Sequence, residues 1–323
     1  MISNPNPHEG AAQHQLIIVE ATRRGIDIED ISSEYGTLAT HLSNGNISAV
    51  IVQGIVQEWL NKEAVTLCDE KRLTKTLFDS LNIPNPKSCV FSRPKDLRGK
   101  IQENQEYVCK PVLGTNGIGV QLEIRSMKDV DAYYSKYGGL YPIHLLEEFA
   151  EGYDLRIQVI DSKIVAVCLR LPAFVEGDGS STLAELIDMR RQEIRSQNPA
   201  NDLIVDHISR KLIELQGFSL NQLIPSERKI RLNEIANLAQ GGHAIDVTDE
   251  IDIIYHEWVA SIANELKTGY FALDVITTDH KKFVPGNSLV LELNIRAEWM
   301  HHTFSEKRTH DLARLIIDTL FNE

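Results

Sequence analysis

The stretch YFALDVITTDHKKFVPGNSLVLELNI, residues 270–295, is the most informative part of the chain. Its segments 271–276 and 289–295 read as two apolar strands, separated by a polar stretch that contains a Pro-Gly-Asn turn. Each strand carries one acid among apolar residues, Asp274 in the first and Glu292 in the second. The pattern predicts a β-hairpin with a carboxylate on each strand.

The two acids lie at equal distances from Phe283, the centre of the loop. A simple antiparallel register therefore places Asp274 opposite Glu292, and the strand period of two puts Asn294 on the same face as Glu292. Like charges that face each other destabilise a sheet unless something neutralises them. Two carboxylates and an amide oxygen suit a hard cation such as Mg²⁺, so we expect these three residues to bind metal. A pair of rim acids, or one acid paired with Lys or Arg, would give the same pattern.

A glycine-rich loop follows a predicted strand over residues 105–112. Gly114, Gly117 and Gly119 leave room for backbone N–H groups to approach phosphate oxygens, and Lys110 on the strand can bring a positive charge to the same phosphates. The loop lacks the Gly-Lys-Ser/Thr of a P-loop. The alternative is an ordinary glycine turn after a strand.

A polar strand face predicts a further anion site. Asp154 and Arg156 alternate with apolar residues on one strand, and Arg170 lies on the next strand of a predicted hairpin. The alternative is an internal salt bridge from Arg156 to Asp154 or Glu148.

Two other segments are weaker candidates. The loop Asn237-Leu238-Ala239-Gln240-Gly241-Gly242 reads either as an anion loop or as an ordinary turn. His301 and His302 follow the acidic hairpin, and only this position makes them candidates for a substrate contact. No spacing to a third ligand points to zinc there.

The remaining elements mix hairpins and helices instead of alternating regularly. Two hairpins are expected: 38–42 with 49–53, turning at Asn44-Gly45, and 155–159 with 164–171, turning at Asp161-Ser162. Helices are expected over 14–24 and 70–81, and from the capping box of Thr182 and Glu185 to about 196. Two more helices are expected at 259–266 and 312–320, where apolar residues recur on one helix face. This order favours α+β layers over a doubly wound parallel sheet.

Composition narrows the functional classes. The 323 residues carry a formal charge of −13, which argues against a general nucleic-acid binder. The cysteines Cys68, Cys89, Cys109 and Cys168 are scattered, so neither a disulfide framework nor a thiolate zinc site is expected. No apolar run is long enough to span a membrane, and residues 1–10 do not form a secretory signal. We therefore expect a cytoplasmic protein that contacts neither membranes nor nucleic acid.

Taken together, these segments resemble the ATP-grasp carboxylate–amine ligases, most closely the ligase module of cyanophycin synthetase and of bifunctional glutathione synthetase. The resemblance runs from about residue 70 to residue 321. It rests on the following stretches in this order: EKRLTK (70–75), CKPV (109–112) with its glycine loop, EEFAEGYDLR (147–156), RLPA (170–173), GDGSSTLAEL (177–186), NLAQGG (237–242), AIDVTD (244–249), LDV (273–275) and ELN (292–294).

The resemblance implies a role for each matching position. The implied assignments are Lys71 and Lys110 as ATP-contacting lysines, Glu147, Glu148 and Phe149 as the hinge beside the adenine, Asp154 as a ribose contact, Asp274, Glu292 and Asn294 as Mg²⁺ ligands, and Arg156, Arg170 and the loop of Asn237, Gly241 and Gly242 near the phosphates, with Lys110, Arg156 and Arg170 as the catalytic set.

The chemistry implied by the resemblance is amide-bond formation. ATP would phosphorylate a substrate carboxylate, and an amine would displace phosphate from the acyl phosphate, leaving an amide, ADP and phosphate. The implied cofactors are ATP and two Mg²⁺ ions, with Mn²⁺ as a substitute, and the implied assembly is a homodimer. The alternatives are a small-molecule kinase on the same fold, which would need no amine, and a non-catalytic nucleotide-binding module.

The chain departs from the family's pattern after Asn294, where it reads IRAEWMH instead of small residues and proline. This segment lines the acceptor side in the family, so we expect a different amino-acid or small-peptide substrate. Arg296 would bind a substrate carboxylate or form a salt bridge with Glu298, and His301 would contact the substrate. We expect a stand-alone ligase without the partner catalytic modules of its relatives.

The same resemblance implies a fold of two α+β subdomains that grip the nucleotide, preceded by a short α/β domain. The predicted domains are a short N-terminal domain over 1–66, a first ATP-grasp subdomain with the glycine-rich loop over 67–145, and a second over 146–323 with an insertion at about 197–235.

Overall fold

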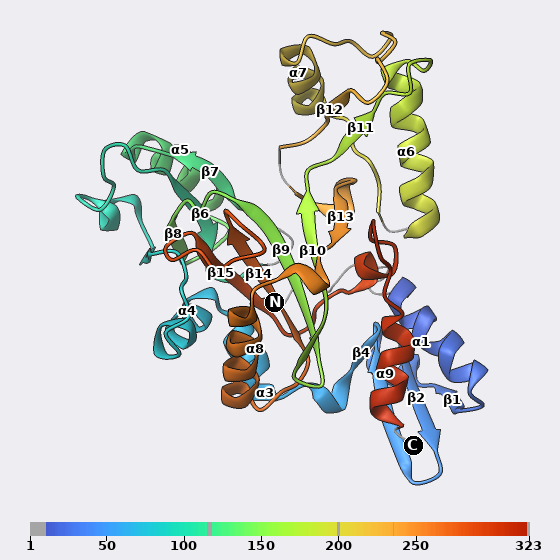
Figure 1. Ribbon diagram of the computed structural model, residues 1–323. Helices are drawn as coiled ribbons and strands as arrows, with labels where there is room; N and C mark the ends of the chain where they lie inside the picture. The colour runs from blue at the N-terminus through green and yellow to red at the C-terminus, as the bar shows by residue number, and fades with distance from the viewer. Residues whose placement is uncertain (1–10, 115–117, 199–200, 235, 322–323) are drawn as a thin grey trace. The chain divides into compact units, whose positions relative to one another are not determined.

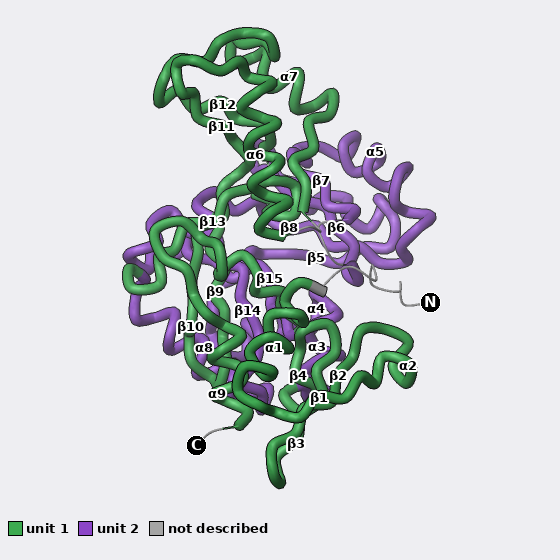
Figure 2. Tube along the Cα trace, turned by 90° about the vertical axis from the view of Figure 1, so that its right-hand side faces the viewer, with its two compact units in different colours: residues 1–59, 154–250, 296–323 green, residues 60–153, 251–295 purple. Residues whose placement is uncertain are grey.

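The structure, a computed structural model, describes residues 11–114, 118–198, 201–234 and 236–321 (Figure 1). Its contacts define two units, which Figure 2 shows in different colours: unit 1 comprises residues 1–59, 154–250 and 296–323, and unit 2 comprises residues 60–153 and 251–295. Helices and antiparallel strands mix in both units, which confirms the α+β class. The division into three consecutive domains stays a prediction.

Unit 1 begins with a four-stranded antiparallel sheet in the order β1-β2-β3-β4. The register of β2 and β3 closes at Asn44 and Ile47, so Gly45 and Asn46 form the two-residue turn, and Gly45 has the positive φ of 60° that such a turn requires. The helices α1 and α9 pack together in this unit (Figure 1). The elements are α1 (Ala11–Arg23), β1 (Asp27–Asp30), α2 (Ser32–Tyr35), β2 (Ala39–Asn44), β3 (Ile47–Val52), β4 (Ile55–Val56), η1 (Gln57–Trp59) and α9 (Leu312–Leu320).

A buried histidine joins α1 to this sheet. His14 is 2% exposed, its Nε2 lies 2.9 Å from Thr40 Oγ1, and its Nδ1 accepts the N–H of Gly54 at 3.2 Å. Burial lowers the pKa of His14 to about 4, although the charge of Asp30 opposes the shift. The ring is therefore neutral in the folded protein at pH values where the unfolded chain already binds a proton.

Acidification is expected to destabilise unit 1 through His14. Its pKa falls from 6.5 in the unfolded chain to about 4 in the fold, so stability is lost as the pH falls through this window. Between pH 7.5 and pH 5 the loss amounts to roughly 2 kcal/mol. Urea unfolding at both pH values tests this: His14→Gln should reduce the pH-dependent loss by roughly 2 kcal/mol, whereas His256→Gln, on the exposed side of a helix, should leave it unchanged. Equal pH dependence in both variants would contradict the prediction.

A second antiparallel sheet of unit 1 contains β9 (Tyr153–Ile160), β10 (Lys163–Leu171) and β13 (His243–Asp246), with β10 in the middle. Asp161 and Ser162 connect β9 to β10 with φ angles of 51° and 61°, which is the left-handed turn that matches strand twist and confirms the predicted hairpin. Three 3₁₀ turns also belong to unit 1: η3 (Leu238–Gln240) precedes β13 in the sequence, η4 (Thr248–Glu250) follows β13, and η5 (Met300–Thr303) comes later in the chain.

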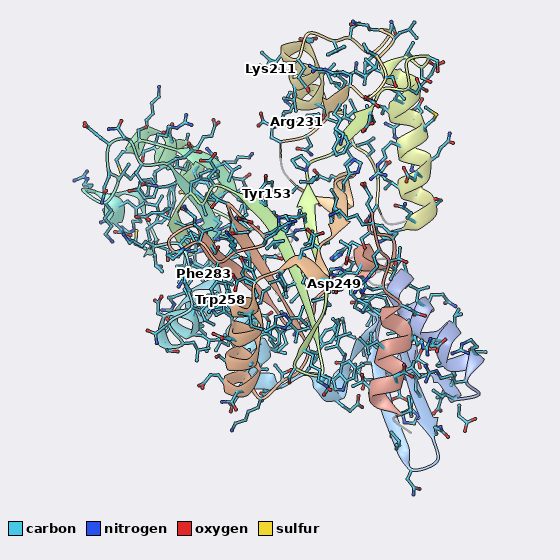
Figure 3. All side chains as sticks on the ribbon, viewed as in Figure 1. Tyr153, Lys211, Arg231, Asp249, Trp258 and Phe283 are labelled. Atoms are coloured by element: carbon cyan, nitrogen blue, oxygen red, sulfur yellow. The ribbon has the colours of Figure 1, made fainter. Side chains whose placement is uncertain are left out.

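A segment of unit 1 that we call the excursion, residues 174–231, has a hydrophobic core of its own. Its strands β11 (Phe174–Glu176) and β12 (Lys229–Arg231) pair with each other. The helices α6 (Leu183–Gln197) and α7 (His207–Leu215) lie between these strands in the sequence. The predicted capping box is present, because Thr182 accepts the N–H of Glu185 and Glu185 accepts the N–H of Thr182. Figure 3 labels Lys211 on α7 and Arg231 at the end of β12. The core residues include Leu183, Ile187, Ile194, Ile213, Ile224 and Ile230.

Unit 2 contains a four-stranded antiparallel sheet in the order β5-β8-β6-β7. Phe91, Cys109, Ile124, Tyr133 and Leu146 form part of the core between this sheet and α5. The elements are α3 (Lys62–Asp69), α4 (Lys71–Ser80), β5 (Ser88–Phe91), η2 (Pro94–Leu97), β6 (Tyr107–Pro111), β7 (Gln121–Ile124), α5 (Met127–Tyr137) and β8 (His144–Glu148).

The acidic hairpin of unit 2 consists of β14 (Phe271–Thr277) and β15 (Ser288–Asn294), preceded by α8 (Ile253–Leu266). Its loop is tied to α8, because Phe283 donates its N–H to Asp252 at 2.9 Å and stacks edge-on against Trp258 with ring centroids 5.7 Å apart (Figure 3). None of the helices formed by the described residues combines the length and the apolar content that a bilayer-spanning helix needs.

Candidate active site

The acidic hairpin has the predicted register at its open end. Asp274 on β14 pairs with Glu292 on β15, and Ala272 pairs with Asn294. A bulge follows, because the next pair is Val275 with Val290, so Leu291 is the extra residue. Asp274 is buried and Glu292 is half-buried. The sequence thus correctly predicted that two carboxylates face each other, although the bulge was not expected.

Neighbouring donors partly neutralise the two carboxylates. Lys71, the first residue of α4, places its Nζ 3.0 Å from Glu292 Oε1 and also donates to the Gly114 carbonyl at 2.6 Å. The Asn294 side chain donates to Asp274 Oδ2 at 3.2 Å. Asp274, Glu292 and Asn294 thus bring two carboxylates and an amide oxygen together. These residues therefore fit a hard divalent cation.

A buried ion triad lies in the β5-β8-β6-β7 sheet and α4. Glu147 on β8 is 3% exposed, and its carboxylate binds Lys110 of β6 at 2.8 Å and Lys75 of α4 at 2.6 Å. Burial alone would raise the pKa of Glu147, but the charges of Lys110 and Lys75 outweigh burial and lower it. Burial lowers the pKa of Lys75, against the opposing charge of Glu147. The triad of Glu147, Lys75 and Lys110 carries a net charge of about +1, and its ion pairs hold Lys110 in place.

The glycine-rich loop begins directly after β6. Gly114 accepts the Lys71 ammonium, which connects the loop to Glu292 through one side chain. Gly119 has φ 77°, and a Cβ there would lie 2.8 Å from Pro111 Cγ, so this position requires glycine. Gly117 lies outside the described residues.

The predicted adenine hinge uses some of its backbone groups within the sheet. The N–H groups of Glu148 and Phe149 donate to the carbonyls of Lys87 and Glu106 at 2.9 Å each. The Phe149 side chain is 39% exposed. A base at this hinge would therefore have to use carbonyl oxygens and the Phe149 ring.

In unit 1, Asp154 forms a salt bridge with Arg170. The guanidinium of Arg170 donates to Asp154 Oδ1 at 3.0 and 2.7 Å across the β9–β10 pair. Arg156 pairs in register with Cys168, is 8% exposed, and interacts electrostatically with Glu298. The structure thus contains a salt bridge on this face, but between different partners from those considered in the sequence.

The loop around Asn237 is a tight turn. The Asn237 carbonyl accepts the N–H groups of Gln240 and Gly242, and its side chain accepts the N–H of Ala239 at 3.0 Å. Gly241 has φ 91°, and a Cβ on Gly242 would lie 2.8 Å from the Leu171 carbonyl oxygen. The structure therefore supports the turn, and anion binding by this loop stays a prediction.

The two candidate substrate residues in the segment after the hairpin differ in their exposure to solvent. Arg296 is exposed, whereas His301 is 4% exposed and its Nδ1 lies 3.0 Å from Glu298 Oε2. Glu298 thus pairs with His301, which the sequence analysis did not consider.

Lys75 forms an ion pair with Glu147 in the structure, and the sequence had not indicated a role for this lysine. The available signal was its spacing, because Lys71 and Lys75 are one helical turn apart and share a face of α4.

No known family model matches the chain. Cyanophycin synthetase from Synechocystis sp. (strain ATCC 27184 / PCC 6803 / Kazusa) is 32% identical over 271 residues, which are 80% of this chain and 31% of that protein. A bifunctional glutathione synthetase from Pasteurella multocida is 22% identical with a TM-score of 0.73, covering 96% of this chain and 43% of its own. The ATP-grasp ligase PsnB, solved with the precursor peptide PsnA2 and AMPPNP, is 12% identical with a TM-score of 0.50, covering 96% of this chain and 93% of its own.

These likenesses confirm the expected ATP-grasp fold. The chain spans about a third of the length of the curated relatives that it matches.

Proposed function

We propose that this chain, which has the fold of the ATP-grasp ligases and resembles them in sequence, joins a carboxylate to an amine at the expense of ATP. The carboxylate would be phosphorylated to an acyl phosphate with release of ADP, and the amine would then displace phosphate to leave an amide. The observation that carries the proposal is the pairing of Asp274 with Glu292 beside Lys71 in unit 2. This arrangement combines ligands for Mg²⁺ with a cation for the nucleotide phosphates.

Asp274, Glu292 and Asn294 would hold Mg²⁺ through their oxygens, and the same oxygens would also suit Mn²⁺ or a second Mg²⁺. When bound, the metal neutralises charge on the phosphoryl group in transfer. The Lys71 ammonium, now 3.0 Å from Glu292, would turn to a phosphate oxygen of the bound nucleotide.

The remaining residues of unit 2 would bind the nucleotide. Lys110, held by Glu147, would contribute a fixed positive charge near the phosphates, since ions positioned before the reaction stabilise charge without reorganising. The loop that includes Gly114 and Gly119 would bring backbone N–H groups to the phosphates and exclude water from the acyl phosphate. Glu148 and Phe149 would contact the adenine.

Residues of unit 1 would handle the ribose and the reacting groups. Asp154 would accept a ribose hydroxyl, while Arg156 and Arg170 would stabilise the acyl phosphate by charge-assisted hydrogen bonds. The loop of Asn237, Gly241 and Gly242 would contribute backbone groups. Arg296, which is exposed, would contact an amino-acid or small-peptide substrate. We also propose a cytoplasmic homodimer.

The proposal is tested by measuring phosphate release from MgATP across pairs of amino acids and short peptides, with mass spectrometry of the products. We expect release that depends on both members of a pair, equal amounts of ADP, phosphate and amide, and a product mass equal to the sum minus water. Release of AMP would contradict the proposal. A phosphorylated product that forms without any amine would instead support a kinase, and nucleotide binding without turnover on any pair would support a non-catalytic module.

A further inference from the structure

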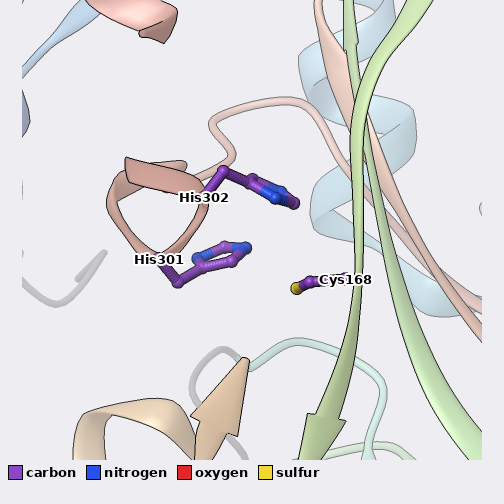
Figure 4. A group of neighbouring side chains, drawn as sticks. All are labelled: Cys168, His301 and His302. Carbon is purple, nitrogen blue, oxygen red and sulfur yellow. The ribbon is translucent and has the colours of Figure 1, made fainter. Parts of the chain in front are cut away.

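A cysteine and two histidines of unit 1 meet in the interior, although they lie far apart in the sequence. Cys168 lies on β10, while His301 and His302 lie on η5, and Figure 4 shows both imidazole rings directed toward the cysteine. Cys168 and His302 are fully buried and His301 is 4% exposed. One ligand atom from each of the three residues lies within 4.8 Å of the other two.

His302 supplies the observation that points to a ligand. Neither ring nitrogen of this buried side chain has a hydrogen-bond partner among the described residues. A buried polar group without a hydrogen-bond partner is costly, so such groups normally have a partner in a folded protein. Burial, together with the charges of His301 and Arg156, lowers the pKa of His302 well below its usual range, so the ring carries a free lone pair at neutral pH.

Glu298 orients the second histidine. Its Oε2 lies 3.0 Å from His301 Nδ1. When Glu298 is ionised, Nδ1 donates the proton of this hydrogen bond and Nε2 keeps the lone pair. A carboxylate behind a metal-binding histidine is the usual arrangement in metal sites, because it fixes the tautomer and makes the ring more basic. The ring centroids of His301 and His302 are 4.2 Å apart, and one ligand atom of each ring lies within 4.8 Å of the other and of Cys168 Sγ.

Charged residues flank Cys168 across the sheet. Cys168 pairs in register with Arg156 on β9 and with Asp246 on β13. Asp246 supplies negative charge beside a bound cation, and burial raises the pKa of Glu298 to about 7, against the opposing charge of Arg156.

We propose that Cys168, His301 and His302 form a second metal site, which takes a divalent cation of the Zn²⁺ class. Sulfur and imidazole nitrogen are the ligands that such borderline-soft ions prefer, whereas Mg²⁺ prefers the oxygens of β14 and β15. On binding, the Cys168 S–H bond breaks, its proton passes to solvent and a sulfur–metal bond forms, while each imidazole donates a lone pair. Three protein ligands leave one position of a tetrahedron for water or a small molecule.

Cobalt titration of the full chain tests the site. Co²⁺ replaces Zn²⁺ in such sites, and a bound thiolate gives a sulfur-to-cobalt charge-transfer absorption that carboxylate ligands cannot give. Excess Mg²⁺ in the buffer occupies the oxygen ligands. We expect the band to saturate at one Co²⁺ per chain and to disappear when Zn²⁺ is added, which yields the affinity for Zn²⁺ by competition.

Four variants separate this site from other binding. Cys168→Ser should abolish the charge-transfer band, and His302→Gln should weaken Co²⁺ binding by more than about 100-fold. Glu298→Gln should weaken binding by about 10–100-fold through loss of ring orientation. Cys109→Ser, at a cysteine that is equally buried in unit 2, should leave the band unchanged. Absence of the band in the natural sequence, or its persistence in a folded Cys168→Ser protein, would overturn the proposal. The readout does not depend on ligase activity.

Discussion

Replacing Glu147 with glutamine is expected to destabilise unit 2 by about 3–5 kcal/mol, as removal of one partner from a buried ion group generally does. The isosteric amide keeps the volume of the side chain but removes the charge that neutralises Lys75 and Lys110. Their ammonium groups, now 2.6 and 2.8 Å from the carboxylate, would then face each other in the interior without a counter-charge. Urea unfolding followed by circular dichroism measures the loss, and hydrogen exchange in β6 and β8 locates it.

Two further variants show whether the loss comes from buried charge. Glu106→Gln breaks an exposed ion pair with Arg125 in the same unit and should cost no more than about 0.5 kcal/mol. Adding Lys75→Met to Glu147→Gln should recover part of the loss, because it removes one of the two uncompensated cations. A loss for Glu147→Gln as small as that for Glu106→Gln would refute the prediction.

Replacing Asp274 with asparagine is expected to lower the rate of phosphate release by at least about 100-fold, since metal ligands contribute several kcal/mol to phosphoryl transfer. The variant removes one of the two carboxylates that face each other across β14 and β15. In metal-free buffer the same change should stabilise the hairpin by a few tenths of a kcal/mol, about the size of the like-charge penalty that it relieves. The increase in melting temperature on adding Mg²⁺ and ATP should disappear.

The control for this variant is Asp279→Asn, in the loop of the same hairpin. Asp279 accepts the N–H of Lys281 and lies beyond the bulge, so its replacement should leave phosphate release within about two-fold of the natural sequence, as for most surface changes. Asp274→Asn protein that is folded and retains full activity would exclude Asp274 as a metal ligand.

The local features of the fold follow from the sequence because they depend on neighbours along the chain. The turn at Asp161 and Ser162 and the capping box of Thr182 and Glu185 form where the sequence predicts them. The pairing of Asp274 with Glu292 was predictable for the same reason, since a hairpin register is nearly fixed by the position of its loop. The bulge at Leu291 was not predictable, because it depends on hydrogen bonds that have no pattern in side-chain chemistry.

Contacts between distant segments could not be predicted from one sequence. Nothing in the spacing of Cys168 and His301 indicates that β10 and η5 meet, and so a thiolate metal site was not expected. The salt bridge between Asp154 and Arg170 was missed for a similar reason, because it depends on the register between β9 and β10. The counter-charge for Glu147 comes from α4, a helix whose packing the sequence does not specify.

The paired ends of the excursion make it an exchangeable module. Phe174 and Arg231 are strand neighbours, so the chain leaves and returns at nearly the same point. Its core of buried leucines and isoleucines is its own. Because the entropy of closing a loop grows slowly with its length, evolution can lengthen, shorten or replace this segment at small cost to the rest of unit 1. A grafting experiment that swaps residues 174–231 between relatives is therefore a practical route to new variants.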